Sequence, residues 1–483
     1  MTQSLSAVLA ACIAAAGMTG SPARADSASS DSPSSSGAAQ LQDLNVVRTQ
    51  YLPKEMAYSP ATRALAEAEL DKLEQQAGSL SPAQFTVGLA LVGALTDNAH
   101  SGLRRFDPRA QPVSRLPLRL LWFPDALIVA RATGAAASLA GARVIRVEGR
   151  SPEALFADSK AILGGSPSGR KHWLNEWIES AGILHALGLA ASPEKLSMTL
   201  RLRDGSIVDR VIDMRPVSEM PPTAARARLW SPEPMPGEHD WATAIGTERI
   251  PLYLRDADRP FRAVPLPDLH ALYVQFRSNE DEEGFPIKTF LDSVTAKIAA
   301  THPARLIVDL RFDEGGNLLT TLDFMRQLPG SVRGRIYLLV GPYTFSAGII
   351  SAAALKKSGG ARVTVVGDTI GDRLHFWSEG DSIDLPNSHY SFRYTDGQFN
   401  LKDGCTGEPG CMDDRYPIIN VNFAPLAPTL RAPLTAAVYF ALRDPGMEAV
   451  AADIGTHTVA HTAAHTAAHT AAQATRPSRS ARP

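Results

Sequence analysis

The chain has 483 residues, of which 44% are hydrophobic and 20% are charged, and its formal net charge is -2. This is ordinary globular composition, with enough length for about two or three domains. Nucleic acid and an anionic membrane surface are excluded as predicted partners, because either would call for a basic patch and the sequence has no basic blocks.

The amino-terminus predicts a secretory signal peptide over residues 1–25. An apolar run extends from about Leu5 to Met18 and is too short to cross a bilayer as a helix, and the small-x-small pattern of a cleavage site follows at 23–25. No Lys or Arg precedes the run. A lipoprotein cleavage site at Cys12 is the alternative, disfavoured because the residues after it stay apolar. We therefore expect a periplasmic or secreted protein with no integral membrane segment in the mature chain.

A flexible leader and two helices are expected next. Residues 26–40 are mostly Ser, Ala, Asp and Pro, which cannot bury a core, and the leader is predicted to reach residue 58. Leucines at helical spacing predict a helix over Pro60 to Gln76. Ser81-Pro82 then supplies a cap and a first-turn proline for a second, more apolar helix.

The middle of the chain is predicted to be rich in strands. Residues 116–149 form apolar segments around a Gly-rich turn, and residues 194–212 predict a hairpin that turns at Asp204-Gly205. Between them, about 152–189, the pattern is helical. A Pro/Met-rich stretch over 216–236 is typical of a linker.

From Leu269 onward, short apolar strands alternate with helical segments of about 10 to 15 residues. This alternation predicts right-handed βαβ units and a mainly parallel sheet. The loops at the carboxyl ends of such strands gather in one crevice, so this part of the chain is the candidate for catalysis.

Cys405 and Cys411 close a short Gly/Pro loop and are expected to form a disulfide in an oxidising compartment. Two thiolates without further ligands make only half a metal site, and no metal or cofactor is predicted. The tail repeats His every fourth residue from 457 to 469. On a helix this spacing would permit metal capture, but a low-complexity, disordered extension is the favoured interpretation.

Two glycine-bearing loops follow successive predicted strands. In the first, Gly315-Gly316 would let backbone N–H groups turn into a cavity. In the second, Ser346 begins a helix, so its hydroxyl and the amide of Ala347 lie at the positive end of the helix dipole. Together they could supply a nucleophile and an oxyanion hole for acyl transfer, although a glycine turn or a serine helix cap is common by itself.

Three motifs in this order resemble the tail-specific, or carboxyl-terminal-processing, serine peptidase family: D-L-R-x-D-x-G-G-N (309–317), T-x-S-A (344–347) and V-G-D-T-x-G (366–371). The resemblance extends from about Pro60 to Leu430. It implies Ser346 as nucleophile and the amides of Gly316 and Ala347 as oxyanion donors.

The resemblance also implies an α/β fold in which a PDZ-like β-rich domain with a helical insert, carried by the segment GARVIRVEG, precedes a crotonase-like βαβ core. The predicted divisions are a signal peptide at 1–25, a flexible leader at 26–58, an N-terminal helical segment at 59–110, the PDZ-like domain at 111–220, a linker at 221–265, the catalytic domain at 266–450 and a low-complexity tail at 451–483.

The proton acceptor is less directly indicated. The best-known branch of the family uses a lysine directly after T-x-G, where this chain has Asp372. Lys356 and Lys357 lie about 15 Å along the helix from the serine, and a solvated helix end is the better interpretation. A second, tricorn-like branch uses Ser-His-Glu with an upstream D-x-H-type motif. That branch implies His100 as the general base, and His375 is its competitor.

Glu379 is predicted to orient the imidazole, because it lies in an Asp-Arg, aromatic, Glu-Gly segment that precedes Leu-Pro-Asn-Ser in related secreted members. A surface-turn acid is the alternative, and the tricorn-like spacing points to Asn422 instead. Asp372 and Arg373 are expected to pair and shape their loop.

The sequence thus predicts an exported serine peptidase that cleaves protein or peptide substrates. A catalytically inactive peptide- or ligand-binding protein on the same scaffold is the alternative. An acyl-CoA enzyme is disfavoured, because export removes it from acyl-CoA pools.

Overall fold

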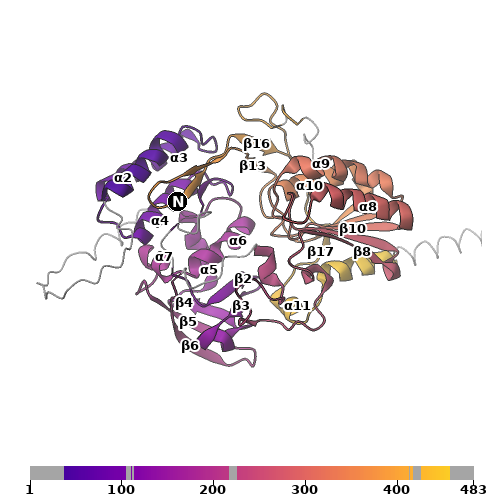
Figure 1. Ribbon diagram of the computed structural model, residues 1–483, viewed down its shortest axis with the longest axis horizontal. Coiled ribbons are helices and arrows are strands. Elements are labelled where there is room, and N and C mark those ends of the chain that lie inside the picture. Colours follow the sequence, from indigo (N-terminus) through magenta and orange to yellow (C-terminus); the bar gives the residue numbers. More distant parts are fainter. Residues whose placement is uncertain are drawn as a thin grey trace, which may run out of the picture.

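The computed structural model describes residues 37–104, 110, 114–216, 226–412, 414–416 and 426–456. The predicted signal peptide with Cys12, the His repeat of the tail and Asn422 lie outside these ranges. The described chain is a mixed α/β structure, with helices first, an antiparallel sheet next and a mainly parallel sheet toward the carboxyl end (Figure 1). The expected fold class is confirmed. No helix in these ranges has both the length and the apolar character needed to cross a bilayer.

A six-stranded sheet forms the α/β core, in the order β17-β12-β11-β10-β9-β8. All neighbours pair in parallel except β8 and β9. Strands β9, β11 and β12 are buried at every residue, which explains why they read as continuous apolar runs. The strands are β8 (Phe261–Leu266), β9 (Ala271–Phe276), β10 (Arg305–Asp309), β11 (Ile336–Val340), β12 (Val363–Gly367) and β17 (Leu430–Arg431).

Helices cover both faces of this sheet (Figure 1). One face packs on α8 (Ile287–Thr301), α9 (Leu318–Gln327) and α10 (Ala347–Gly359), which connect successive parallel strands as the alternating pattern predicts. The opposite face packs on the helical segment 445–456, whose Val450 is fully buried. The three-layer arrangement leaves the loops at the strand ends as the place for a site.

A second sheet, in the order β2-β3-β4-β5-β6, is antiparallel throughout, and β7 (Ala242–Thr243) pairs with β3. Three helices lie between β4 and β5 in the sequence, so the expected β-rich segment with a helical insert is observed. The PDZ-like assignment remains a prediction. The elements are β2 (Leu118–Trp122), β3 (Leu127–Ala132), β4 (Arg143–Val147), α5 (Pro152–Asp158), α6 (Pro167–Ile178), α7 (Ala181–Ala186), β5 (Lys195–Arg201) and β6 (Ile207–Asp213).

The two expected amino-terminal helices are α3 (Pro60–Gln76) and α4 (Pro82–Ala94). Each begins with a capping box, in which the serine side chain before the helix accepts a backbone N–H three residues on, and each has proline in its first turn. The cap and proline signals in the sequence therefore correspond to real helix starts.

An additional helix, α2 (Gly37–Val46), and the π-helical turn η1 (Val47–Tyr51) occupy part of the segment whose composition predicts a flexible leader. Leu44 is fully buried, and the ring of Tyr51 lies 4.4 Å from that of Phe392. These apolar side chains pack against residues more than 300 positions away in the sequence. The composition of a short stretch of sequence cannot reveal such contacts.

Strand β1 (Gly102–Arg104), which follows α4, pairs antiparallel with β15 (Ser391–Arg393), and β15 pairs with β14 (Ser382–Asp384). Two nearby strands, β13 (His375–Ser378) and β16 (Gly397–Asn400), pair with each other. The β1–β15 pairing fixes the turn after α4 against the region that follows β12.

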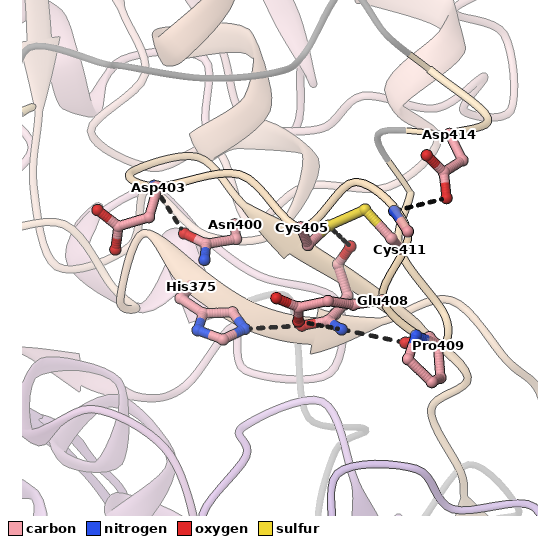
Figure 2. Close-up of a disulfide and its surroundings, with 10 residues drawn as sticks. His375, Asn400, Asp403, Cys405, Glu408, Pro409, Cys411 and Asp414 are labelled. Atoms are coloured by element: carbon pink, nitrogen blue, oxygen red, sulfur yellow. Dashed lines mark hydrogen bonds between the residues drawn. A yellow bond between two sulfur atoms is a disulfide. The ribbon is translucent and has the colours of Figure 1, made fainter.

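The expected disulfide between Cys405 and Cys411 is present, with an S–S distance of 2.12 Å (Figure 2). It closes the loop that follows β16. Within this loop Glu408 Oε2 and the Pro409 carbonyl both accept hydrogen bonds from the Gln398 amide. The disulfide loop is therefore tied to β16.

Candidate active site

Ser346 lies in a tight turn between β11 and α10, with φ 51° and ψ -125°. A positive φ is costly for a residue with a Cβ atom, and strained residues of this kind cluster at functional sites. The Ser346 side chain makes no capping hydrogen bond to the helix. The helix-cap interpretation of this serine therefore has no support in the geometry.

The conformation of this turn is held from outside. The buried Thr344 hydroxyl donates to the Leu310 carbonyl at 2.7 Å and accepts from the Gly341 amide at 3.0 Å. The Phe345 amide donates to the Asp313 carbonyl at 3.0 Å. These bonds attach the serine turn to the loop after β10, and the Thr344 side chain supplies one of them.

The Gly315-Gly316 loop packs directly on the serine turn. Both glycines have positive φ, 96° and 133°. A Cβ atom on Gly315 would lie 2.6 Å from Ser346 Cβ and 2.9 Å from the Ala347 amide nitrogen. Only glycine fits there, and the close approach puts the loop and the start of α10 side by side.

His100 lies in the turn between α4 and β1. It is buried, and its ring stacks on Phe345 at 4.4 Å and on Phe376 at 5.4 Å between centroids. Phe345 is the chain neighbour of Ser346. Burial, together with the charges of Arg104 and Arg393, lowers the pKa of His100 to about 3. The imidazole is therefore neutral at physiological pH, as a proton acceptor must be.

Ser346, His100 and Gly316 all line one cavity of about 700 Å³. Aromatic and aliphatic side chains form much of its wall, and three arginines and three glutamates also contribute. These residues are Trp173, Trp177, Ile162, Leu163, Ile183, Arg104, Arg115, Arg393, Glu176, Glu280 and Glu314. The cavity has the size and mixed lining of a substrate site.

Asp372 faces His100. Its Oδ2 atom lies 3.9 Å from His100 Nδ1, and its Oδ1 atom accepts the Arg373 amide at 2.8 Å. Neither ring nitrogen of His100 nor Asp372 Oδ2 has a hydrogen-bond partner among the described residues. Burial raises the pKa of the Asp372 carboxyl to about 6, so it is ionised at neutral pH.

Arg373 joins the loops on either side of this pair. Its guanidinium donates to the Asp97 carbonyl at 2.8 Å, to Asp97 Oδ2 at 2.9 Å and to the Gly165 carbonyl at 3.3 Å. Nearby, the Ser166 hydroxyl donates to the Gly371 carbonyl at 2.8 Å. The arginine side chain thus pairs with Asp97. The expected pairing of Asp372 with Arg373 is limited to the hydrogen bond that Asp372 Oδ1 accepts from the Arg373 backbone amide.

The other predicted groups lie elsewhere. Glu379 has φ 55° and lies in the turn between β13 and β14, where burial raises the pKa of its carboxyl. His375 Nε2 lies 2.9 Å from Gln398 Oε1. Neither residue lines the cavity. Lys356 Nζ donates to the Gly360 and Val363 carbonyls at the end of α10, which agrees with the helix-end interpretation.

A scan against models of known protein families finds no match, and a search of curated proteins finds none. Among solved structures, mature CPAF complexed with lactacystin matches at 12% identity over 88% of this chain and 99% of that chain, with a TM-score of 0.56. A CPAF mutant matches at 13% identity over 84% and 95%, with a TM-score of 0.51. The photosystem II D1 C-terminal processing protease matches at 13% identity over 83% and 94%, but its TM-score of 0.35 carries no weight. The chain therefore shares the fold of CPAF.

Proposed function

We propose that the protein is a serine peptidase that hydrolyses protein or peptide substrates. The observation that carries this proposal is the strained Ser346 turn, packed on a double-glycine loop and sharing one cavity with a buried neutral histidine. The fold shared with CPAF supports it. The sequence motifs 309–317 and 344–347 coincide with the two loops that build the turn.

In the proposed reaction Ser346 Oγ attacks the substrate carbonyl carbon, and its proton passes to His100 Nε2. The developing oxyanion is held by the amides of Gly316 and Ala347. When the C–N bond breaks, the imidazolium returns the proton to the leaving amine and an acyl-enzyme remains. Water then attacks the ester carbonyl carbon and gives a proton to His100, and the imidazolium returns that proton to Ser346 Oγ as the acyl C–Oγ bond breaks and the acid is released. No cofactor takes part.

Two features outside the site bear on the proposed compartment and on substrate binding. The disulfide between Cys405 and Cys411 fits an oxidising compartment, so the predicted export to the periplasm or beyond is part of the proposal. The predicted PDZ-like sheet would position a substrate chain. The sequence predicts that Glu379 orients the imidazole, but Glu379 does not line the cavity that holds Ser346 and His100.

Labelling with a fluorophosphonate probe tests the proposal most directly. Wild-type protein should be labelled and should hydrolyse a casein or peptide-library substrate, and Ser346→Ala should lose both. Ser358→Ala is the matched control, because Ser358 is exposed in the same helix α10 and should change neither. Hydrolysis that survives Ser346→Ala would overturn the proposal.

A catalytically inactive peptide-binding protein is the second candidate. One observation favours it: His100 accepts no hydrogen bond from the Ser346 hydroxyl in the structure. Resting enzymes often tighten this bond only when substrate binds. A wild-type serine that stays unlabelled while the protein binds peptides would support the inactive scaffold.

A further inference from the structure

Two buried polar groups near Ser346 face each other with atoms that have no hydrogen-bond partner in the part of the chain that the structure describes. These are His100, at both ring nitrogens, and Asp372 at Oδ2. Their side chains are 7% and 2% exposed, and Nδ1 lies 3.9 Å from Oδ2. Native interiors leave few such groups unsatisfied. A closure of about 1 Å would bring the two atoms within hydrogen-bond distance and satisfy both.

The carboxylate has a fixed direction. Asp372 Oδ1 is occupied by the Arg373 amide, which leaves Oδ2 aimed at the imidazole. The loop that carries Asp372 is anchored in turn, because Arg373 holds Asp97 on the His100 turn and Ser166 holds the Gly371 carbonyl. The Arg373–Asp97 contact therefore ties the loop that carries Asp372 to the turn that carries His100, and the Ser166 bond ties the same loop to the start of α6.

Resting on the proposed peptidase function, we infer that Asp372 is the positioning residue of the site. Its carboxylate accepts a hydrogen bond from His100 Nδ1–H, and this leaves Nε2 without a proton as the acceptor for Ser346. Asp372 then takes the orienting role for which the sequence predicts Glu379.

The charged groups around His100 and Asp372 indicate a second role for the Asp372 carboxylate. Arg104 and Arg393 face His100 and oppose its protonation, whereas Arg373 and Asp97 are the charged groups that act on Asp372. A buried imidazolium beside two arginines requires a counter-charge at the moment when it forms. Asp372 is the carboxylate in contact distance that supplies it.

Glu379 makes no comparable approach. The Glu379 side chain packs against Gly397, where an added Cβ atom would lie 2.8 Å from Glu379 Cγ and 3.1 Å from Glu379 Cβ. The Arg393 guanidinium donates to the Glu379 backbone carbonyl at 3.2 Å. The side chain is thus placed against β16, while its neighbour Arg393 lines the cavity.

The test compares Asp372→Asn with Glu379→Gln. Asp381→Asn is the control, because Asp381 is an exposed acid in the same turn as Glu379. Asp372→Asn should lower kcat about 10²- to 10⁴-fold, as loss of a histidine-orienting carboxylate does elsewhere, while KM stays within about 3-fold. The fall of kcat/KM below about pH 6 in the wild type should be absent in Asp372→Asn, whose remaining acidic limb belongs to His100. A loss of kcat with Glu379→Gln and none with Asp372→Asn would overturn the inference.

A second readout does not depend on activity. In ¹⁵N-histidine NMR, with His100 assigned by comparison with His100→Gln, the wild type should show the Nδ1–H tautomer and Asp372→Asn should change the tautomer or its titration. An identical His100 signal in both proteins would overturn the inference even in an active peptidase. An inactive wild type that nonetheless shows the Asp372-dependent tautomer would leave the positioning contact standing and refute the peptidase function alone.

Discussion

Arg373 and Asp97 are 276 residues apart in the sequence, yet the Arg373 guanidinium donates both to the Asp97 carbonyl and to its carboxylate. The contact joins the turn that carries His100 to the loop that carries Asp372. Because the two side chains are about half exposed, an ion pair of this kind adds about 1 kcal/mol or less to stability. Its contribution is to the relative position of the two loops.

Arg373→Ala should therefore lower kcat by about 10- to 100-fold with little change in the free energy of unfolding, since small displacements of catalytic groups are costly. Asp97→Asn keeps the carbonyl contact and should have a milder effect. The measurements are steady-state kinetics and urea denaturation. Arg443→Ala, which breaks the exposed pair with Glu448, is the matched control and should leave kcat unchanged.

Gly315→Ala should reduce the rate of fluorophosphonate labelling at least about 100-fold, the scale of losing an oxyanion donor. The added methyl would meet Ser346 Cβ at 2.6 Å, and φ 96° is strained for alanine. Gly330→Ala is the control, because a Cβ there meets nothing within 4 Å. Equal labelling of the two variants would show that the loop and the serine turn do not need this close approach.

The buried Asp313 should make stability depend on pH. Burial raises the pKa of its carboxyl to about 8 from an ordinary 3.8, so the folded state favours the protonated form. The resulting stabilisation is complete below about pH 4 and is lost as the pH rises through 8, at up to about 1.4 kcal/mol per pH unit.

Asp313→Asn, which keeps an oxygen to accept the Gly315 amide, should remove this slope. Urea denaturation at several pH values between 5 and 8 should show that the free energy of unfolding of the variant increases relative to that of the wild type as the pH rises. Asp323→Asn, on an exposed acid, should run parallel to the wild type. Parallel curves for Asp313→Asn as well would contradict the shifted pKa.

Leu44→Ala should cost about 2 to 5 kcal/mol of unfolding free energy, because the Leu44 side chain is fully buried against η1 and the β15 region. Leu41→Ala, in the same helix but 45% exposed, should stay within about 0.5 kcal/mol of the wild type. Similar losses for both would mean that α2 does not pack as described.

The part of the site that lies within βαβ units could be predicted from sequence. Ser346 and Gly315 follow adjacent parallel strands, and the carboxyl ends of such strands meet at one edge of a sheet, so local patterns were sufficient to bring them together. The capping serines of α3 and α4 and the disulfide are equally local signals.

The features that local patterns missed depend on contacts between distant segments. Helix α2 is held by Phe392 and its neighbours, which no window around residue 40 contains. From the sequence, Asp372 is only a residue at the position of the family's lysine, or an acid that shapes its loop. Its contact with His100 depends on the pairing of β1 with β15, which joins distant segments of the chain. Each of these strands has three residues, too few to give a periodic signal.

The β1–β15 pairing also sets when the site comes into existence. A ribosome makes the His100 turn long before the Ser346 turn, and the strand that locks the two regions together, Ser391–Arg393, is made after both. A nascent chain that has already folded its first helices therefore carries an imidazole with no nucleophile beside it. On the proposed function, hydrolysis therefore becomes possible only after residue 393 has been synthesised, so a shorter and still partly unfolded polypeptide lacks the assembled site.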